Sequence, residues 1–346
     1  MTEPTKERGR AIEEFLAAGG WPNARHFSLA ADASFRRYER VIDGRRLAVL
    51  MDAPPDLEDV HAFARIARHL NRLGFSAPKI LAEDSDNGFL LLEDLGDDTF
   101  SRLLAEGESE EELYALAVDV LAALHALPAA AAAPGWLDAY GEEKLLEEAG
   151  WFTDWYLPAV SGKETAATTR DAYLAAWRAV LPIVHGQPRT LVLRDYHVDN
   201  LLRLKGPDGV RDIRTCGLLD FQDAVAGPAA YDLMSLLEDA RRDVADDLAQ
   251  TMLARYFDAM GDAMKDKDRE SFIAAYAVLG AQRHAKVIGV FTRLARRDGK
   301  DGYLRHIPRV WGLLERGLEN PLLGPLKAWF DVHVPKELRH RPEKLG

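Results

Sequence analysis

The sequence of 346 residues contains a single cysteine, Cys216, which excludes a disulfide framework and a zinc site built from cysteines. It also lacks a surplus of positive charge, because 44 Lys and Arg stand against 56 Asp and Glu, a formal net charge of −12. We therefore expect no non-specific binding to nucleic acid or to an anionic membrane. A nucleotide remains a possible ligand, since it needs only a local basic pocket.

Long apolar runs are absent as well. No stretch reaches the roughly 18 uninterrupted apolar residues of a membrane span, and the longest candidate, 276–294, is interrupted by several polar and charged residues. The first ten residues are charged and lack the apolar centre of a signal peptide. These absences predict a cytoplasmic protein that does not bind membranes, and nothing in the sequence indicates an obligate protein partner.

The residues that are present have the balance of a soluble globular protein, with 47% hydrophobic and 29% charged residues. At about 150 residues per domain, the length allows two domains or one fold with two lobes.

The first 94 residues have the pattern of a small antiparallel sheet with helices. The order predicted after a first helix is three strands, one helix and two strands, and Asp43-Gly44 is typical of a hairpin turn. The predicted helices are 11–18 and 57–73, and the predicted strands begin near Phe27 and include 37–42, 47–51, 77–81 and 89–92.

From residue 95 onward the sequence becomes rich in alanine and mainly helical in its periodicity. We predict helical structure over 101–127, a loop over the alanine-rich 128–134, and further helices from 142, from 165 and over 231–318. Two short apolar runs, 191–193 and 217–219, interrupt this pattern, and an aspartate follows each closely: Asp195 and Asp220.

Those two aspartates belong to the most informative segments, 193–202 and 218–223. Asn200 follows Asp195 by five positions, and Asp220 follows a short strand. Phosphoryl transfer requires a carboxylate that accepts the proton of the attacking hydroxyl, and hard oxygen ligands for Mg²⁺ beside the phosphates. Aspartate and asparagine also cap helices at strand ends. The combination of all three residues behind a small antiparallel sheet favours the chemical interpretation.

These segments resemble the aminoglycoside phosphotransferase and choline kinase-like group, which shares the protein-kinase fold. The motifs are Arg-Asp-Tyr-His-Val-Asp-Asn at 194–200, Leu-Asp-Phe-Gln-Asp-Ala at 219–224 and Gly-Pro-Ala-Ala-Tyr-Asp at 227–232, and the resemblance extends from about 27 to 318. It implies an α+β fold of two lobes, a sheet-containing N-lobe over 1–94 and a helical C-lobe over 95–346, with ATP between them.

The resemblance also implies roles for individual residues. Asp195 would be the catalytic base with Arg194 beside it, and Asn200 and Asp220 would hold Mg²⁺. The backbone around Glu93 and Leu95 would bind the adenine edge. Asp232 is more typical of a buried brace for the catalytic loop than of a reacting group.

The sequence departs from the group at the phosphate grip. Met51 stands where the third strand usually carries a lysine, the helix that usually supplies its glutamate reads Phe-Ala-Arg-Ile at 63–66, and the glycine-rich loop is replaced. Because both partners are missing together, we expect an arginine to serve the phosphates. The candidates are Arg36, Arg37 and Arg65, with Ser34 as a further phosphate donor; an ordinary hairpin loop with exposed arginines is the alternative.

Within the group, the sequence is most similar to the anomeric kinases of N-acetylmuramate and N-acetylglucosamine in cell-wall recycling. The similarity lies in 32–38, 51–55 and 282–289. It implies transfer from ATP to the sugar's anomeric hydroxyl. Asp223 is expected to contact sugar hydroxyls or to cap a helix. Arg283 and Lys286 form a basic stripe that could receive the lactyl carboxylate.

Two other functions remain open from the sequence. One is a kinase of aminoglycosides or choline-like molecules, since several acidic residues, Asp199, Asp223, Glu238 and Asp239, could line a pocket for a cation. The other is a non-catalytic nucleotide-binding regulator, which Met51 suggests and which the presence of Asp195, Asn200 and Asp220 opposes. The sequence leaves the sugar preference undecided.

Overall fold

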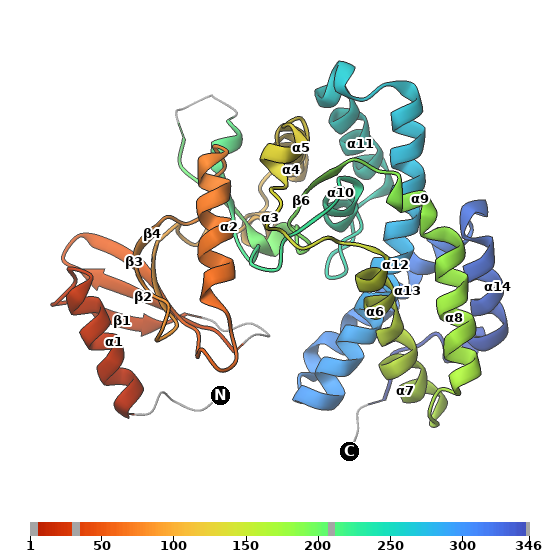
Figure 1. Ribbon diagram of the computed structural model, residues 1–346, viewed down its shortest axis with the longest axis horizontal. Helices are drawn as coiled ribbons and strands as arrows, with labels where there is room; N and C mark the ends of the chain where they lie inside the picture. The colour runs from red at the N-terminus through yellow and green to blue at the C-terminus, as the bar shows by residue number, and fades with distance from the viewer. Residues whose placement is uncertain (1–5, 30–34, 207–211, 344–346) are drawn as a thin grey trace. The chain divides into compact units, whose positions relative to one another are not determined.

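A computed structural model describes residues 6–29, 35–206 and 212–343, so the predicted phosphate donor Ser34 lies outside the described residues. The chain packs as two units (Figure 1): unit 1 comprises Met1–Ala117 and Val198–Ala224, and unit 2 comprises Val118–His197 and Val225–Gly346. The chain passes from one unit to the other just after the segment that carries Asp195. The division into lobes at residue 94 stays a prediction.

Unit 1 is built on a five-stranded antiparallel sheet, as the sequence predicted. The strand order is β1-β2-β3-β5-β4, and β2 and β3 are joined by a tight turn in which Gly44 has a φ of 62°. The strands are β1 (Arg25–Ser28), β2 (Arg37–Asp43), β3 (Arg46–Asp52), β4 (Ile80–Asp84) and β5 (Phe89–Glu93).

Two helices accompany the sheet. α1 (Lys6–Ala18) buries Ile12, Phe15 and Leu16 against side chains of the central strands, among them Leu50 and Phe89. α2 (Val60–Arg72) begins where the Asp59 carboxylate accepts a hydrogen bond from the backbone N–H of His61 at 2.8 Å, and it stops before Gly74, whose φ is 90°. A side-chain cap at the start and a left-handed glycine past the end are the usual helix boundaries.

The remainder of unit 1 connects the sheet to the Asp220 segment. The helical periodicity predicted over 101–127 corresponds to two helices, because Gly107, with a φ of 92°, separates α3 (Phe100–Ala105) from α4 (Glu110–His125). The short strands β7 (Leu201–Arg203) and β8 (Cys216–Leu218) pair antiparallel, and a bridge between Ser76 and Gly217 ties β8 to the chain before β4.

Unit 2 is mainly helical, with the 33-residue α12 (Asp266–Asp298) packed against α6, α10 and α13 (Figure 1). The predicted loop over 128–134 was wrong in part, because the alanines there form a short helix that begins after Pro128. The other helices are α5 (Ala129–Ala132), α6 (Glu142–Trp151), α7 (Leu157–Ser161), α8 (Ala167–Val180), α9 (Pro182–His185), α10 (Ala230–Leu237), α11 (Asp246–Met260), α13 (Ile307–Leu318) and α14 (Gly324–His333).

One turn of π-helix, η1 (Phe152–Tyr156), continues α6 and packs against α12. The two backbones approach closely at Gly289: a Cβ atom there would lie 2.5 Å from the carbonyl carbon of Trp151. Tyr156 is fully buried and donates to the backbone carbonyl of Leu338 at 2.6 Å, so it belongs to the core. Only glycine allows α12 to lie this close to η1.

The segment that carries Asp195 follows β6 (Arg189–Val192), which pairs with β9 (Val225–Pro228) in a two-stranded ladder of unit 2. α10 starts two residues after β9, which brings Asp232 of its first turn under the end of β6. Among the described residues, no helix combines the length and the hydropathy that a membrane span needs.

Candidate active site

The segment that follows β6 is held by Asp232. This side chain is fully buried and accepts hydrogen bonds from the backbone N–H groups of Leu193 at 2.6 Å and Arg194 at 2.9 Å. Burial raises the pKa of Asp232 to about 7, although the two hydrogen bonds favour its ionised form. The prediction that Asp232 is a buried brace for this segment is confirmed, and the catalytic role of the segment stays a prediction.

Arg194 has a left-handed backbone, with a φ of 71°. A residue with a Cβ atom pays of order 1 kcal/mol or more for that conformation, so it persists only where the surroundings enforce it. Asp232 accepts a hydrogen bond from the backbone N–H of Arg194, and the Arg194 guanidinium donates to the carboxylate of Glu148. The strained backbone therefore delivers a cation to a defined carboxylate.

Glu148, on α6, is completely buried and has three partners. Its carboxylate contacts Arg194, lies 3.0 Å from Nζ of Lys286 on α12, and accepts a hydrogen bond from the hydroxyl of Tyr140 at 2.5 Å. Burial opposes ionisation, but Lys286, Arg194 and the Tyr140 hydroxyl together hold the pKa of Glu148 below its ordinary value. Glu148 is a buried, paired anion.

Asp195 lies among these cations. The Asp195 side chain is exposed to solvent. Although the protein around it disfavours its charge, Lys286, followed by Arg283, His197 and Arg194, keeps the pKa of Asp195 below its usual range. An exposed carboxylate that stays ionised can accept a proton from a substrate hydroxyl. We call Asp195 and the residues around it the Asp195 cluster: Arg194, Asp195, Glu148, Asp232, Arg283 and Lys286.

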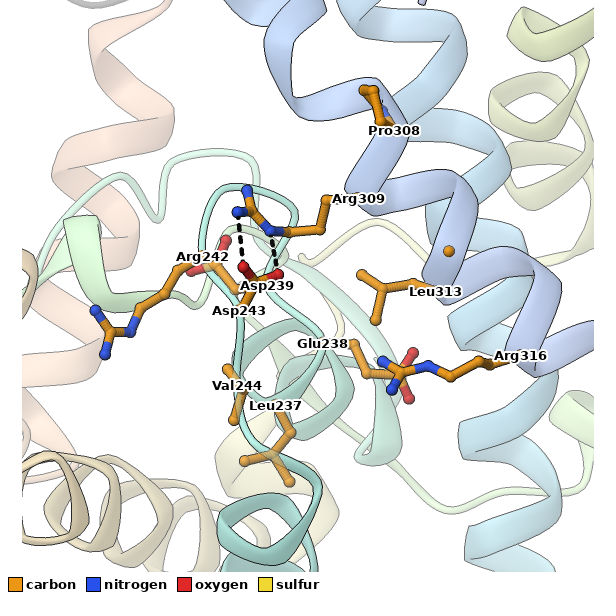
Figure 2. A pocket seen from close by; sticks show the side chains of 11 residues that line it. Leu237, Glu238, Asp239, Arg242, Asp243, Val244, Pro308, Arg309, Leu313 and Arg316 are labelled. Carbon is orange, nitrogen blue, oxygen red and sulfur yellow. Dashed lines mark hydrogen bonds and ion pairs between the residues drawn. The ribbon is translucent and has the colours of Figure 1, made fainter. Parts of the chain in front are cut away.

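Unit 2 also contains a pocket of about 500 Å³ between the segment after α10 and α13 (Figure 2). Figure 2 shows Arg309 bonded to Asp243, and Arg316 lying beside Glu238. Asp239 in its wall is 1% exposed, and its Oδ2 has no hydrogen-bond partner in the described part of the chain. The same segment reaches the catalytic loop, since Nη1 of Arg241 lies 2.9 Å from Nε2 of His197.

The second group of predicted residues lies in unit 1. Asp220 has a φ of 56°, the left-handed region that recurs at functional sites. Nδ2 of Asn200 lies 3.4 Å from Oδ2 of Asp220, and Nε2 of the buried Gln222 donates to Asp220 at 3.0 Å and to Asp223 at 3.2 Å. The structure thus brings Asn200, Asp220 and Asp223 together.

Arg36 belongs to the same group. Its side chain is buried and forms an ion pair with Glu58 at 2.8 Å, and Tyr38, Asp223 and Asp220 lie near enough to raise its pKa. Burial, together with the charge of Asp220, raises the pKa of Tyr38 to about 12, so Tyr38 keeps its proton. We call this set the Asp220 cluster: Arg36, Tyr38, Glu58, Asn200, Asp220, Gln222 and Asp223.

Comparison with known proteins identifies the family to which this chain belongs. The sequence pattern of the phosphotransferase enzyme family matches residues 28–270. The chain belongs to this family.

Relatives of this phosphotransferase include proteins named N-acetylmuramate/N-acetylglucosamine kinase. The protein from Caulobacter vibrioides is 36% identical over 97% of this chain and 99% of its own length. The protein from Pseudomonas aeruginosa is 39% identical over 88% of each chain.

Solved structures show that the fold is that of small-molecule kinases, as predicted. A choline/ethanolamine kinase family protein from Mesorhizobium loti matches with a TM-score of 0.61 at 14% identity, over 94% of this chain and 99% of its own. The choline kinase of Streptococcus pneumoniae matches with a TM-score of 0.60 at 11% identity, over 92% and 99% of the two chains. The predicted α+β class and kinase-like fold are confirmed, and the phosphotransferase is an enzyme.

The remaining predicted residues of the phosphotransferase lie in unit 1. Arg37 is half-buried on β2 and Arg65 is exposed on α2, whereas Met51 is completely buried in β3. Glu93 ends β5 and accepts from the backbone N–H of Lys79 at 3.3 Å, and Leu95 follows half-buried. The structure groups Arg36 with Glu58 and Asp220.

The donor set of the Asp220 cluster fits a magnesium ion that is shared with phosphates. Among the described residues, no three His, Cys, Asp or Glu side chains form a cage of their own for a metal. Mg²⁺ is commonly held by one or two protein oxygens and completed by phosphate oxygens and water. Asn200 and Asp220 supply that number of side chains.

Sequence reasoning missed Glu58, Tyr38, Tyr140 and Glu148. A signal for Glu148 was present: it lies three residues after Leu145 and one before Ala149, on the apolar face of α6. A glutamate among apolar residues at helical spacing indicates a buried charge with a partner. Glu58 had no such signal, because it precedes α2 in an irregular segment.

Proposed function

We propose that this phosphotransferase transfers the γ-phosphoryl group of ATP to the anomeric hydroxyl of N-acetylmuramate or N-acetylglucosamine in the cytoplasmic recycling of cell-wall sugars. The observation that carries the proposal is Asp195, a solvent-exposed carboxylate kept ionised by surrounding cations on a loop fixed by Asp232. The names of the relatives, which match 97% of the chain in one case, support this choice of substrate.

Asp195 is the base of the proposed reaction. The acceptor's anomeric oxygen attacks the γ-phosphorus, its proton passes to the Asp195 carboxylate, and ADP leaves. An anomeric hydroxyl is more acidic than an ordinary alcohol, so a carboxylate with a low pKa suffices as the acceptor of the proton. Lys286 and Arg283 remain assigned to the acceptor side; because they are buried near Asp195, they act on the reacting end of the sugar.

The Asp220 cluster has the composition to hold the nucleotide's phosphates. Asn200 and Asp220 would hold Mg²⁺, which neutralises charge on the phosphates when bound. Arg36 takes the part of the missing lysine, because its ion pair with Glu58 repeats the cation–carboxylate pairing that is absent at Met51. Ser34 and Arg37 are assigned to the same phosphates, and the backbone from Glu93 to Leu95 to the adenine.

We assign the acceptor to the pocket of unit 2. Its volume of about 500 Å³ falls within the range of small-molecule sites. A sugar hydroxyl would satisfy the unpartnered Oδ2 of Asp239. Arg316 forms an exposed ion pair with Asp246 at 3.0 Å, which it would exchange for a lactyl carboxylate. Asp223, which the sequence also indicated for the sugar, lies with the phosphate-binding residues and is exposed.

A substrate panel tests the proposal. ADP formation is measured with N-acetylmuramate, N-acetylglucosamine, an aminoglycoside and choline, and phosphorus NMR locates the phosphate in the product. We expect sugar 1-phosphates from the two amino sugars only. Preferential turnover of choline or the aminoglycoside, or no turnover at all, contradicts the proposal.

Two arginine variants refine the substrate assignment. Arg316→Ala should lower kcat/KM for N-acetylmuramate at least tenfold more than for N-acetylglucosamine, because a charge-assisted hydrogen bond to a carboxylate contributes about 1.5–3 kcal/mol. Arg283→Ala, beside Asp195, should lower both alike. The reverse result would assign the lactyl carboxylate to Arg283, as the basic stripe in the sequence suggests.

A further inference from the structure

Glu148 has no part in the reaction as described so far, although it contacts two groups that do. Its carboxylate is 0% exposed and joins three elements: α6, from which it comes, the catalytic loop through Arg194, and α12 through Lys286. Tyr140 completes its hydrogen bonds from the chain before α6. All of these residues belong to unit 2.

Burial of a carboxylate with two cations is costly, and the same space filled by apolar side chains often gives a more stable protein. The neighbourhood carries a second cost, the left-handed backbone of Arg194. Two unfavourable features at one point of the core indicate selection for function.

The charges around Asp195 suggest what that function is. Lys286, Arg283, Arg194 and His197 face Asp195 from α12 and the catalytic loop, and Asp232 faces it from α10. Lys286 makes its 3.0 Å ion pair with Glu148. The ammonium is therefore close enough to favour the charge of Asp195, while its own hydrogen bond is directed to a different carboxylate.

We propose that Glu148 is a positioning residue for phosphoryl transfer: it anchors the guanidinium of Arg194 and the ammonium of Lys286 near Asp195, and so keeps that ammonium from pairing with the carboxylate that receives the acceptor's proton. The inference rests on the proposed role of Asp195 as the base. Without the charge of Glu148, Asp195 is the strongest remaining partner for Lys286. A direct ion pair between them competes with the acceptor hydroxyl.

A double-mutant cycle tests this role. Glu148→Gln keeps the shape of the side chain and removes its charge; we expect kcat to fall ten- to a hundredfold with KM for ATP changed less than threefold. In a Lys286→Met background no ammonium is left to cap Asp195, so the same substitution should cost less than fivefold. An equal loss in both backgrounds, or a rise in KM for ATP with kcat unchanged, overturns the proposal.

Glu147→Gln is the matched control. Glu147 is the preceding residue on α6, is exposed, and pairs with Lys144 at 3.0 Å, so its neutralisation should leave kcat and KM within twofold of the wild type. Thermal unfolding of every variant shows whether it is folded. If Glu148→Gln does not fold, Glu148→Asp keeps the charge and should retain kcat within tenfold; a loss beyond a hundredfold in folded Glu148→Asp contradicts the proposal.

The failure of this inference can be distinguished from the failure of the proposed function. Wild type and Asp195→Asn are assayed first with both amino sugars. An inactive wild type, or an Asp195→Asn variant within tenfold of it, rejects the proposed function itself. An active wild type, an inactive Asp195→Asn and additive losses for Glu148 and Lys286 reject the role of Glu148 alone.

Discussion

The Asp220 cluster and the Asp195 cluster contain the same kinds of charged side chains in different proportions. In the Asp220 cluster, three carboxylates, Glu58, Asp220 and Asp223, accompany the single cation Arg36. In the Asp195 cluster, three cations, Arg194, Arg283 and Lys286, accompany three carboxylates: Glu148 and Asp195, whose pKa values are lowered, and Asp232, whose pKa burial raises to about 7. A group in which carboxylates outnumber cations is suited to a metal cation, whereas a group with one cation for each carboxylate keeps a base ionised.

The largest effect is expected from the base of the Asp195 cluster. Asp195→Asn keeps the shape of the side chain and cannot accept the hydroxyl proton, so kcat should fall about 10²- to 10⁴-fold. Nucleotide affinity, measured by calorimetry, should change little if the phosphates depend on the Asp220 cluster. A comparable loss of nucleotide binding would remove the distinction between the two clusters.

The Asp220 cluster should respond instead to magnesium. Asp220→Ala and Asn200→Ala each remove a hard ligand, so the Mg²⁺ concentration for half-maximal rate should rise about tenfold or more. Magnesium titrations of the rate measure this directly. Glu148→Gln, in the other cluster, is the comparison and should leave the midpoint unchanged; unaltered midpoints in both Asp220→Ala and Asn200→Ala would locate the metal elsewhere.

An added cation in the sheet of unit 1 tests whether Arg36 replaces the lysine that is absent at Met51 or whether the phosphate site lacks a cation it needs. Met51→Lys buries an ammonium at a position that is 0% exposed in β3. It should destabilise the protein by several kcal/mol, because an unpaired charge in the core costs at least as much as a buried unsatisfied polar group. Thermal unfolding and kcat are measured together. A gain in kcat would show that Arg36 does not replace the lysine.

The smallest effect concerns Glu238 in the pocket of unit 2. Burial raises the pKa of Glu238 to about 7, so the folded protein retains a proton that the unfolded chain releases above about pH 4.3. Glu238 therefore lowers stability as pH rises from about 4.3 to 7. Glu238→Gln should reduce the fall in Tm between pH 5 and pH 8 by a few degrees at most. An identical pH dependence in wild type and variant would contradict this.

The sequence predicted what depends on local order. The strand and helix order before Glu93 followed from periodicity and turn residues, and the buried Asp232 followed from a motif. The sequence did not predict which arginine forms an ion pair with a carboxylate. Arg36 and Glu58 are 22 residues apart and come together only when the β2–β3 hairpin between them folds. The Glu148 contacts likewise join residues 46 positions apart in the chain. Such pairs depend on tertiary packing, which the hydrophobic periodicity of the sequence does not reveal.

Lys286 and Arg283 also illustrate a limit of surface patterns. Their spacing on α12 is that of a basic stripe, which is typical of a solvated or ligand-facing surface. In the structure Arg283 is 3% exposed and Lys286 is paired with Glu148. A stripe of charge on one helix can be buried when a neighbouring helix supplies the counter-charge. Here Glu148 on α6 supplies it for Lys286, and the sequence of α12 alone does not reveal this.

The π-helical turn after α6 has a consequence for insertions and deletions. A π turn carries one residue more than the α-helix it interrupts, and each residue of an α-helix corresponds to a rotation of about 100°. Loss of one residue from Phe152–Tyr156 would rotate α6 relative to the chain that follows and turn Glu148 away from α12. Homologues that share the Glu148 contact are therefore expected to conserve the length of this segment together with Gly289, even where its side chains diverge.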